Sequence, residues 1–135
     1  MAAERNLDLL LRTMTPELQD GVFVFCTVPA EVGPPSGLTP LMLFREREAI
    51  TLIVRREDAE RAGLTYQFAA RLITLSVLSA LDAVGFLAAV TAKLAAAGIS
   101  VNAVSAFHHD HLFVPEARGK EAVLLLHELS RSAAT

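Results

Sequence analysis

The sequence predicts an α+β fold of the ferredoxin-like type, in which antiparallel sheets carry their helices on one face. The second half of the chain supports this prediction, because apolar strands and amphipathic helices follow in the order β-α-β-β-α. The first half repeats that order with a proline-rich loop in place of its first helix. We therefore predict two similar halves, at residues 1–66 and 67–135.

The first half is predicted to open with a short amphipathic helix over residues 3–14 and to continue as a sheet. Strands rich in β-branched and aromatic residues are expected at 22–28, 41–44 and 49–54. The segment PAEVGPPSGLTP, residues 29–40, holds four prolines and two glycines, which exclude a regular helix. A short helix over residues 57–62 should end at Gly63.

The second half contains the clearest helical pattern of the chain, at residues 84–97. Its predicted buried stripe is Phe86, Val90, Leu94 and Ala97. The extended stretch before it, residues 66–79, exceeds a typical strand of about five or six residues, so we predict two strands joined by a bend. A hairpin of strands 101–107 and 111–114 precedes a final helix over residues 118–130. No strand is predicted after this helix, so a strand from the first half or from another subunit would complete the sheet.

Composition narrows the class of partner. The 135 residues carry a net charge of −3 and no basic stripe, which argues against nucleic acid. No apolar run reaches the roughly 18 residues that would predict a membrane span. The single cysteine, Cys26, lies in an apolar strand and is predicted to be a buried, inert thiol. We expect a soluble cytoplasmic protein, and the apolar surplus together with the missing strand predicts a homodimer.

Two segments of the second half resemble a known family. The segment LDAVGFLAAVTAKLAAAGISVNAVSAF, residues 81–107, resembles the core signature of ACT domains: an Asp-x-x-Gly turn, a helix, and Gly-Ile-x-Val-x-x-Val leading into the next strand. The segment HHDHLFVPEARGKEAVLLLHEL, residues 108–129, resembles short bacterial ACT proteins related to the arginine-sensor branch. The resemblance implies two ACT-like halves, a non-catalytic regulatory protein that binds an amino acid or similar small molecule, and no cofactor.

The resemblance also implies a ligand site between paired ACT units, at the turn before the helix and the start of the strand opposite. In this chain the corresponding residues are Asp82, Ala83, Val84, Gly85 and Phe86 in the turn, with Asn102 and Ala103 opposite. Free N–H groups at a helix N-terminus favour a carboxylate, and Gly85 allows close approach to the backbone. Asp82 and Asn102 are candidates to hold an α-amino group. A plain structural interpretation competes, in which Asp82 caps the helix and Asn102 satisfies a strand edge.

Two further chemistries compete for the hairpin. His108, His109, Asp110 and His111 have the side chains of a divalent-metal site. In an extended strand only His109 and His111 share one face, and the further candidate His127 is distant, so we predict a polar hairpin without metal. A catalytic triad drawn from Ser76, Ser79 or Ser105 lacks a Gly-x-Ser-x-Gly elbow, so a hydrolase is disfavoured. The alternatives to an amino-acid-binding regulator are a structural subunit that dimerises through ACT units without ligand, and a metal-dependent enzyme using the histidines.

Overall fold

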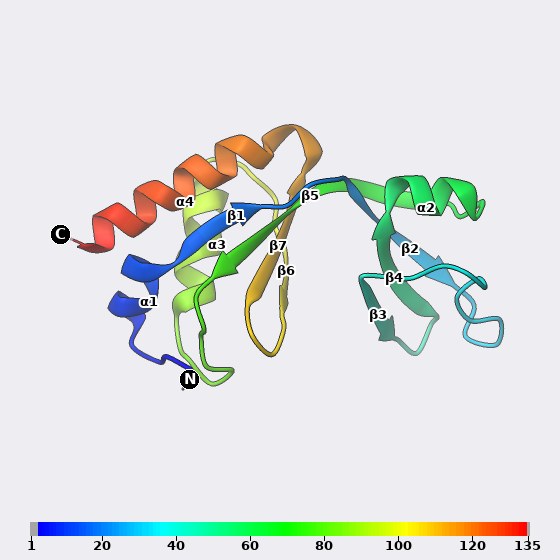
Figure 1. Ribbon diagram of the computed structural model, residues 1–135, viewed down its shortest axis with the longest axis horizontal. Helices are drawn as coiled ribbons and strands as arrows, with labels where there is room; N and C mark the ends of the chain where they lie inside the picture. Colours follow the sequence, from blue (N-terminus) through cyan, green and yellow to red (C-terminus); the bar gives the residue numbers. More distant parts are fainter. Residues whose placement is uncertain (1–2, 135) are drawn as a thin grey trace. The chain divides into compact units, whose positions relative to one another are not determined.

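The computed structural model describes residues 3–134 and has a helix or strand in each predicted segment (Figure 1). Met1, Ala2 and Thr135, which the two predicted halves include, lie outside the described residues. The elements are α1 (Leu7–Thr13), β1 (Thr15–Leu18), β2 (Phe23–Val28), β3 (Met42–Arg45), β4 (Ile50–Arg55), α2 (Arg56–Arg61), β5 (Tyr66–Ser76), α3 (Phe86–Ala96), β6 (Asn102–Ser105), β7 (Asp110–Pro115), a 3-10 turn η1 (Glu116–Arg118) and α4 (Gly119–Ala134).

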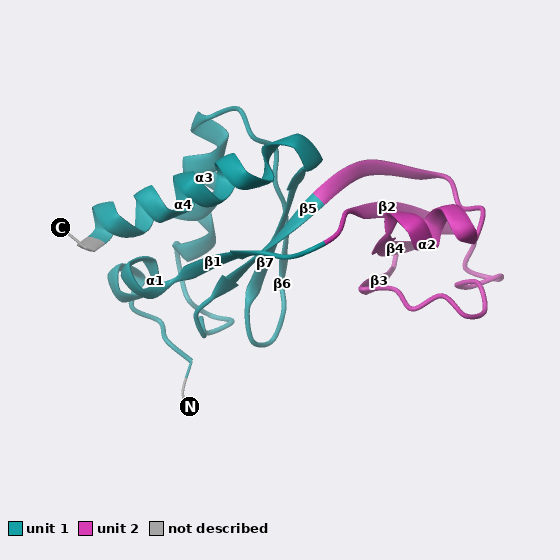
Figure 2. Cartoon of the chain, turned by 45° about the horizontal axis from the view of Figure 1, so that its top comes forward, with its two compact units in different colours: residues 1–20, 71–135 teal, residues 21–70 magenta. Residues whose placement is uncertain are grey.

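The chain folds into two compact units (Figure 2). Unit 2 is residues 21–70, and unit 1 joins the segment that ends at residue 20 to the segment that begins at residue 71. The chain returns from unit 2 to unit 1 within β5, between Ala70 and Arg71. The division at residues 66 and 67 that the sequence suggests stays a prediction about domain organisation.

Unit 2 has the strand order β3-β4-β2-β5, and its connections follow the predicted order of strand, loop, two strands, helix and strand. The β2–β4 ladder runs from Phe23 opposite Arg55 to Val28 opposite Ile50. Residues 29–41 form a loop, because prolines there remove backbone donors and fix φ. The core of this unit lies on the face covered by α2 and is formed by Val24, Cys26, Val28, Ile50, Leu52, Val54 and Ala59.

Unit 1 has the strand order β1-β5-β7-β6; α3 connects β5 to β6, and α4 follows β7 as the last element. Its fourth strand is β1, which pairs antiparallel with β5 from Thr15 opposite Ser76 to Leu18 opposite Ile73. The strand missing from the second half is therefore supplied by the first half of the same chain. The sequence did not reveal β1, because Pro16 suggested a break. Proline is tolerated here because β1 pairs on one side only.

The long extended stretch is one strand with an irregularity, and the predicted pair of strands joined by a bend is wrong in that respect. Strand β5 runs unbroken for 11 residues and ends at Ser76. Phe68 has a φ of 56°, and the register of β5 with β2 shifts between Phe23 and Phe25. A bulge of this kind increases local twist without ending the strand.

The helices of unit 1 pack on one face of its strands, which confirms the α+β, ferredoxin-like prediction. Helix α3 buries Phe86, Val90 and Leu94 as predicted, while Ala97 is half-buried. Gly98, with a φ of 73°, ends the helix, and the Ile99 N–H donates to the Leu94 carbonyl. These side chains meet the inward faces of α1, α4, β5 and β7, whose buried members are Leu10, Leu11, Ile73, Leu75, Leu112, Val114, Ala122 and Leu126.

Gly119 begins α4 where the helix closely approaches β5 and β1. A Cβ atom added to Gly119 would lie 3.1 Å from the Cβ of Arg71 and 3.2 Å from the Cδ1 of Leu18. We expect Gly119→Ala to destabilise the fold by about 1–3 kcal/mol, the usual cost of overpacking. Helix propensity alone would give the opposite sign, a gain of about 1 kcal/mol. Chemical denaturation decides between the two, and a variant more stable than the parent would show that this contact has room.

Candidate functional site

The predicted turn lies between β5 and α3 and leaves the N-terminus of α3 without a side-chain cap. Gly85 occupies the N-cap position with a φ of 92°, in the left-handed region that glycine adopts without strain. No acidic residue lies in the first turn of the helix. The first N–H groups of a helix have no partner within it, so those of α3 are available to an anion. Asp82 does not cap the helix, because its Oδ1 accepts from Arg5 Nε at 2.9 Å.

A pocket of about 190 Å³ adjoins this turn. It is lined by Ser79, Ala80, Leu81, Ala83, Phe86, Leu87, Ser105, Ala106 and Asp110. The turn, the start of α3, the end of β6 and the start of β7 thus contribute to one cavity. Its volume is below the roughly 300–1,000 Å³ typical of sites for drug-sized ligands, and it suits a small metabolite.

Asp110 is the one charged side chain that lines this pocket. The residue is only 7% exposed, and its carboxylate accepts hydrogen bonds from Ser79 Oγ at 3.1 Å and Ser105 Oγ at 2.6 Å. Among residues 3–134, no Lys or Arg forms an ion pair with it. Burying a carboxylate costs free energy unless hydrogen bonds or an opposite charge compensate, and here only hydrogen bonds do.

From the sequence, Asp110 is a candidate only as a metal ligand or a triad member, and its place in this pocket is not predicted. The signal that could have found it is the alternation of β7. Asp110, Leu112 and Val114 share one face of the strand, and the latter two are fully buried in the core. Asp110 is therefore an acidic residue on the core-facing side of β7, where apolar side chains are the rule.

The structure brings only some of the predicted site residues together. Ala83 and Phe86 line the pocket, whereas Val84 is 84% exposed beside it. Asn102 and Ala103 lie outside it, exposed on β6. Asp110 pairs with Ser105 in the β6–β7 ladder, so the last residue of β6, and not its first, lies near the turn. A role of Asn102 and Ala103 in binding stays a prediction.

The histidines of the hairpin bond to other parts of unit 1. His109 Nδ1 lies 3.2 Å from the Val77 carbonyl oxygen, which can only accept, so Nδ1 carries the proton. His111 Nδ1 lies 3.1 Å from Thr74 Oγ1. Burial lowers the pKa of His111, and His109 lowers it further, while Asp110 acts in the opposite direction.

The described part of the chain has the geometry of neither a metal site nor a serine catalytic triad. In residues 3–134 no three His, Cys, Asp or Glu side chains gather as a metal site would require. The hydroxyls of Ser79 and Ser105 donate directly to Asp110, and the hydrogen bonds of His109 and His111 go to Val77 and Thr74. A serine nucleophile needs an adjacent base, and neither serine has a histidine in that position.

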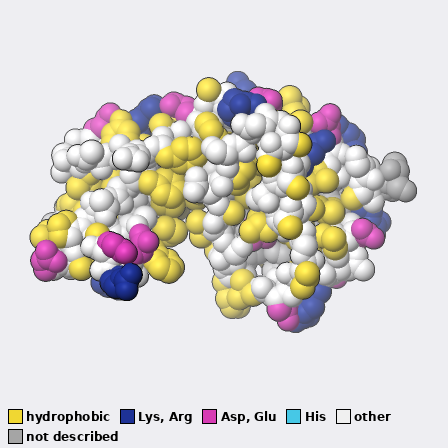
Figure 3. All heavy atoms as spheres, turned by 180° about the vertical axis from the view of Figure 1, so that it is seen from behind, with side chains coloured by type: hydrophobic (Ala, Val, Ile, Leu, Met, Phe, Trp, Pro, Cys, Tyr) yellow, Lys and Arg dark blue, Asp and Glu magenta, His cyan; other side chains and the backbone are white. Residues whose placement is uncertain are grey.

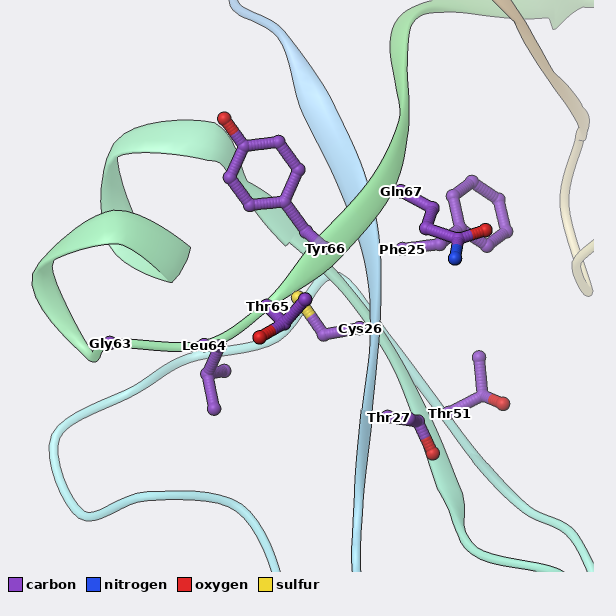
Figure 4. A pocket seen from close by; sticks show the side chains of 9 residues that line it. All are labelled: Phe25, Cys26, Thr27, Thr51, Gly63, Leu64, Thr65, Tyr66 and Gln67. Carbon is purple, nitrogen blue, oxygen red and sulfur yellow. The ribbon is translucent and has the colours of Figure 1, made fainter.

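A larger pocket, of about 630 Å³, lies in unit 2 at the start of β5 (Figure 4). It is lined by Phe25, Cys26, Thr27, Thr51, Gly63, Leu64, Thr65, Tyr66 and Gln67. None of these side chains carries a charge at neutral pH. Cys26 is 4% exposed, and burial raises the pKa of its thiol, consistent with the predicted inert cysteine. The smaller pocket of unit 1 therefore has the more distinctive electrostatics.

Two family models match the chain. Residues 2–71 match one ACT domain model, and residues 67–128 match a second. The chain belongs to the ACT domain family and carries two ACT domains in tandem, which are regulatory, ligand-binding domains. The two matched ranges overlap within β5, the strand in which the two compact units also meet in sequence. No curated protein matches the sequence.

Solved structures agree with this assignment. A protein of unknown function from Vibrio cholerae, described as a possible transport protein, is 43% identical, with a TM-score of 0.82 over 92% of this chain and 95% of that one. A protein from Agrobacterium tumefaciens is 17% identical, with a TM-score of 0.73 over 87% and 89%. The regulatory subunit of aspartate kinase from Thermus flavus is 11% identical, with a TM-score of 0.62 over 86% and 95%. The last two similarities show the fold alone.

On the face drawn in Figure 3, Lys and Arg side chains are interspersed with Asp and Glu, and no basic stripe gathers there. Among residues 3–134, no helix combines the length and the apolar character that a membrane crossing requires.

Proposed function

We propose that this tandem ACT protein is a non-catalytic regulator that binds a free amino acid in the unit 1 pocket. The observation that carries the proposal is the pairing of two electrostatic poles around one small cavity. The N-terminus of α3 has no side-chain cap, and Phe86, the first residue of this helix, lines the same pocket as the buried carboxylate of Asp110. A free amino acid carries one carboxylate and one ammonium, so it complements both poles at once.

Each predicted residue has a part in this proposal. The backbone of Val84, Gly85 and Phe86 would receive the ligand carboxylate, and Ala83 would contact its carbon skeleton. Asp110 would accept a hydrogen bond from the ligand ammonium. Ser79 and Ser105 orient the Asp110 carboxylate by donating to its two oxygens. Asp82, Asn102 and Ala103 are exposed, and we propose that they face the second ACT unit of a pair.

A second function, an interaction subunit that works without ligand, is favoured by one feature. The short edge strand β3 pairs only with β4 among the described strands and carries exposed apolar side chains. Leu41 is 52% exposed, Leu43 38% and Phe44 62%. Exposed apolar edges are commonly covered by a partner, so we propose a homodimer in the cytoplasm that is compatible with either function.

A thermal-shift screen with the twenty standard amino acids separates these functions. A ligand that binds the folded state only, at about 100 times its dissociation constant, stabilises the protein by roughly 2.7 kcal/mol. We expect at least one amino acid to raise the melting temperature. An interaction subunit without a ligand site would show the same melting temperature with every amino acid.

A further inference from the structure

The segment that leads into α1, residues Glu4–Leu7 with Leu7 as the first helical residue, approaches the ligand turn at three points; we call it the N-terminal arm. At the first point the Glu4 N–H donates to the Leu78 carbonyl at 2.7 Å, and the Ala80 N–H donates to the Glu4 carbonyl at 2.8 Å. These bonds make a one-residue parallel bridge between Glu4 and Ser79.

This bridge fixes the backbone of two residues that line the pocket. Ser79 and Ala80 both line the cavity, and Ser79 Oγ donates to the carboxylate of Asp110. The position of the Ser79 hydroxyl therefore depends on a backbone segment that Glu4 fixes from the other side. No strand or helix includes residues 77–85, and beyond its own backbone hydrogen bonds the segment is held by this bridge and by hydrogen bonds to Asp110 and His109.

The second and third contacts extend along the turn. Arg5 Nε donates to Asp82 Oδ1 at 2.9 Å, but both side chains are about two-thirds exposed or more, at 67% and 72%, so this ion pair contributes little. A Cβ atom added to Gly85 would lie 3.4 Å from Leu7 Cδ2, so the Leu7 side chain lies beside the N-cap residue of α3. The arm thus follows the turn from its start to the helix.

The arm is itself anchored in the core of unit 1. Asn6 Oδ1 accepts from the Leu9 N–H at 2.9 Å and caps α1, and Leu10 is fully buried. After α1 the chain continues directly into β1, which pairs with β5. The arm is therefore fixed at its α1 end, and it opposes a displacement of the ligand turn.

We propose that the N-terminal arm is a positioning element for the ligand pocket, so that docking of the arm and binding of the ligand favour one another. This inference rests on the proposed function of the pocket. Only a turn in its ordered position presents Ser79 and the N-terminus of α3 to the ligand, and coupling between two such events is reciprocal. The arm touches no ligand in this scheme and acts through the turn.

Glu4→Pro tests the arm because proline removes the N–H that donates to Leu78 and leaves the cap of α1 in place. Glu4→Gln is the matched control, since it keeps the backbone donor and a side-chain oxygen. The ligand is the amino acid that gives the largest thermal shift in the twenty-member panel. We expect Glu4→Pro to bind it about 2- to 12-fold more weakly, and Glu4→Gln to bind it as the parent does.

Amide exchange in the parent gives a second readout that needs no variant and that a merely structural arm would not change. The N–H groups of Glu4 and Ala80 should exchange more slowly once the same amino acid is added. Equal affinity in Glu4→Pro and the parent, or unchanged exchange at both amides, would overturn the inference. Suppose that one of these two results is found, but that the amino acid binds the parent and binds Asp110→Asn more weakly. In that case only the proposed role of the arm is wrong. If no amino acid binds the parent, the proposed function fails and the arm loses its role with it.

Discussion

Replacing Asp110 by Asn is expected to weaken binding of the amino acid by about 10- to 150-fold. The change removes the negative charge while keeping nearly the same size, so a charge-assisted hydrogen bond to the ligand ammonium, about 1.5–3 kcal/mol, is lost. Of the two serine hydroxyls, at 3.1 and 2.6 Å, one keeps a side-chain oxygen to which it can donate, and the other can accept from the new amide NH2. The measurement is isothermal titration of folded protein with the best ligand of the thermal-shift screen.

Asp58→Asn is the matched control for this experiment. Asp58 lies on α2 in unit 2, pairs with Arg61 at 3.1 Å and is not a lining residue of the unit 1 pocket. It undergoes the same chemical change and should leave the affinity within experimental error. Equal affinity for Asp110→Asn and the parent would show that the carboxylate serves only the hairpin, through Ser79 and Ser105.

Replacing Leu94 by Ala is expected to destabilise the protein by about 2–5 kcal/mol. Leu94 is fully buried, lies on the inward stripe of α3 with Val90, and belongs to the core that holds the helix against β5 and β7. The substitution deletes apolar contacts and leaves a cavity that the close-packed neighbours fill only in part. Urea denaturation followed by circular dichroism measures the difference.

Leu124→Ala serves as the comparison for Leu94→Ala. Leu124 is also a helical leucine, on α4, but it is 66% exposed. Its replacement should change the free energy of unfolding by no more than about 0.5 kcal/mol. Similar losses for the two variants would mean that the inward stripe of α3 is assigned to the wrong face.

The fold could be predicted because apolar periodicity and the glycines at 63, 85 and 98 mark most of its elements. The exception is β1, whose four residues, Thr15–Leu18, include a proline and do not have the composition of a strand. Their strand conformation depends on pairing with β5, a tertiary interaction that local sequence does not encode. The same strand explains why the second half looked incomplete on its own.

The candidate site was predictable only in part. Its turn follows from the Asp-x-x-Gly pattern, and the structure places Ala83 and Phe86 at a cavity. The role of Asp110 depends on three segments, because Ser79 follows β5, Ser105 ends β6, and Asp110 begins β7. Sequence adjacency suggested instead a histidine cluster, but His109 bonds to Val77 and His111 bonds to Thr74.

We propose that the unit 1 pocket recognises both charged groups of a free amino acid. Calorimetric titration of the parent protein with the best amino acid, its decarboxylated amine and its deaminated acid tests this most directly. We predict that each analogue binds at least about tenfold more weakly than the amino acid, since each lacks the partner of one pole. An acid that binds as tightly as the amino acid would exclude recognition by Asp110, and an amine that does so would exclude the N-terminus of α3.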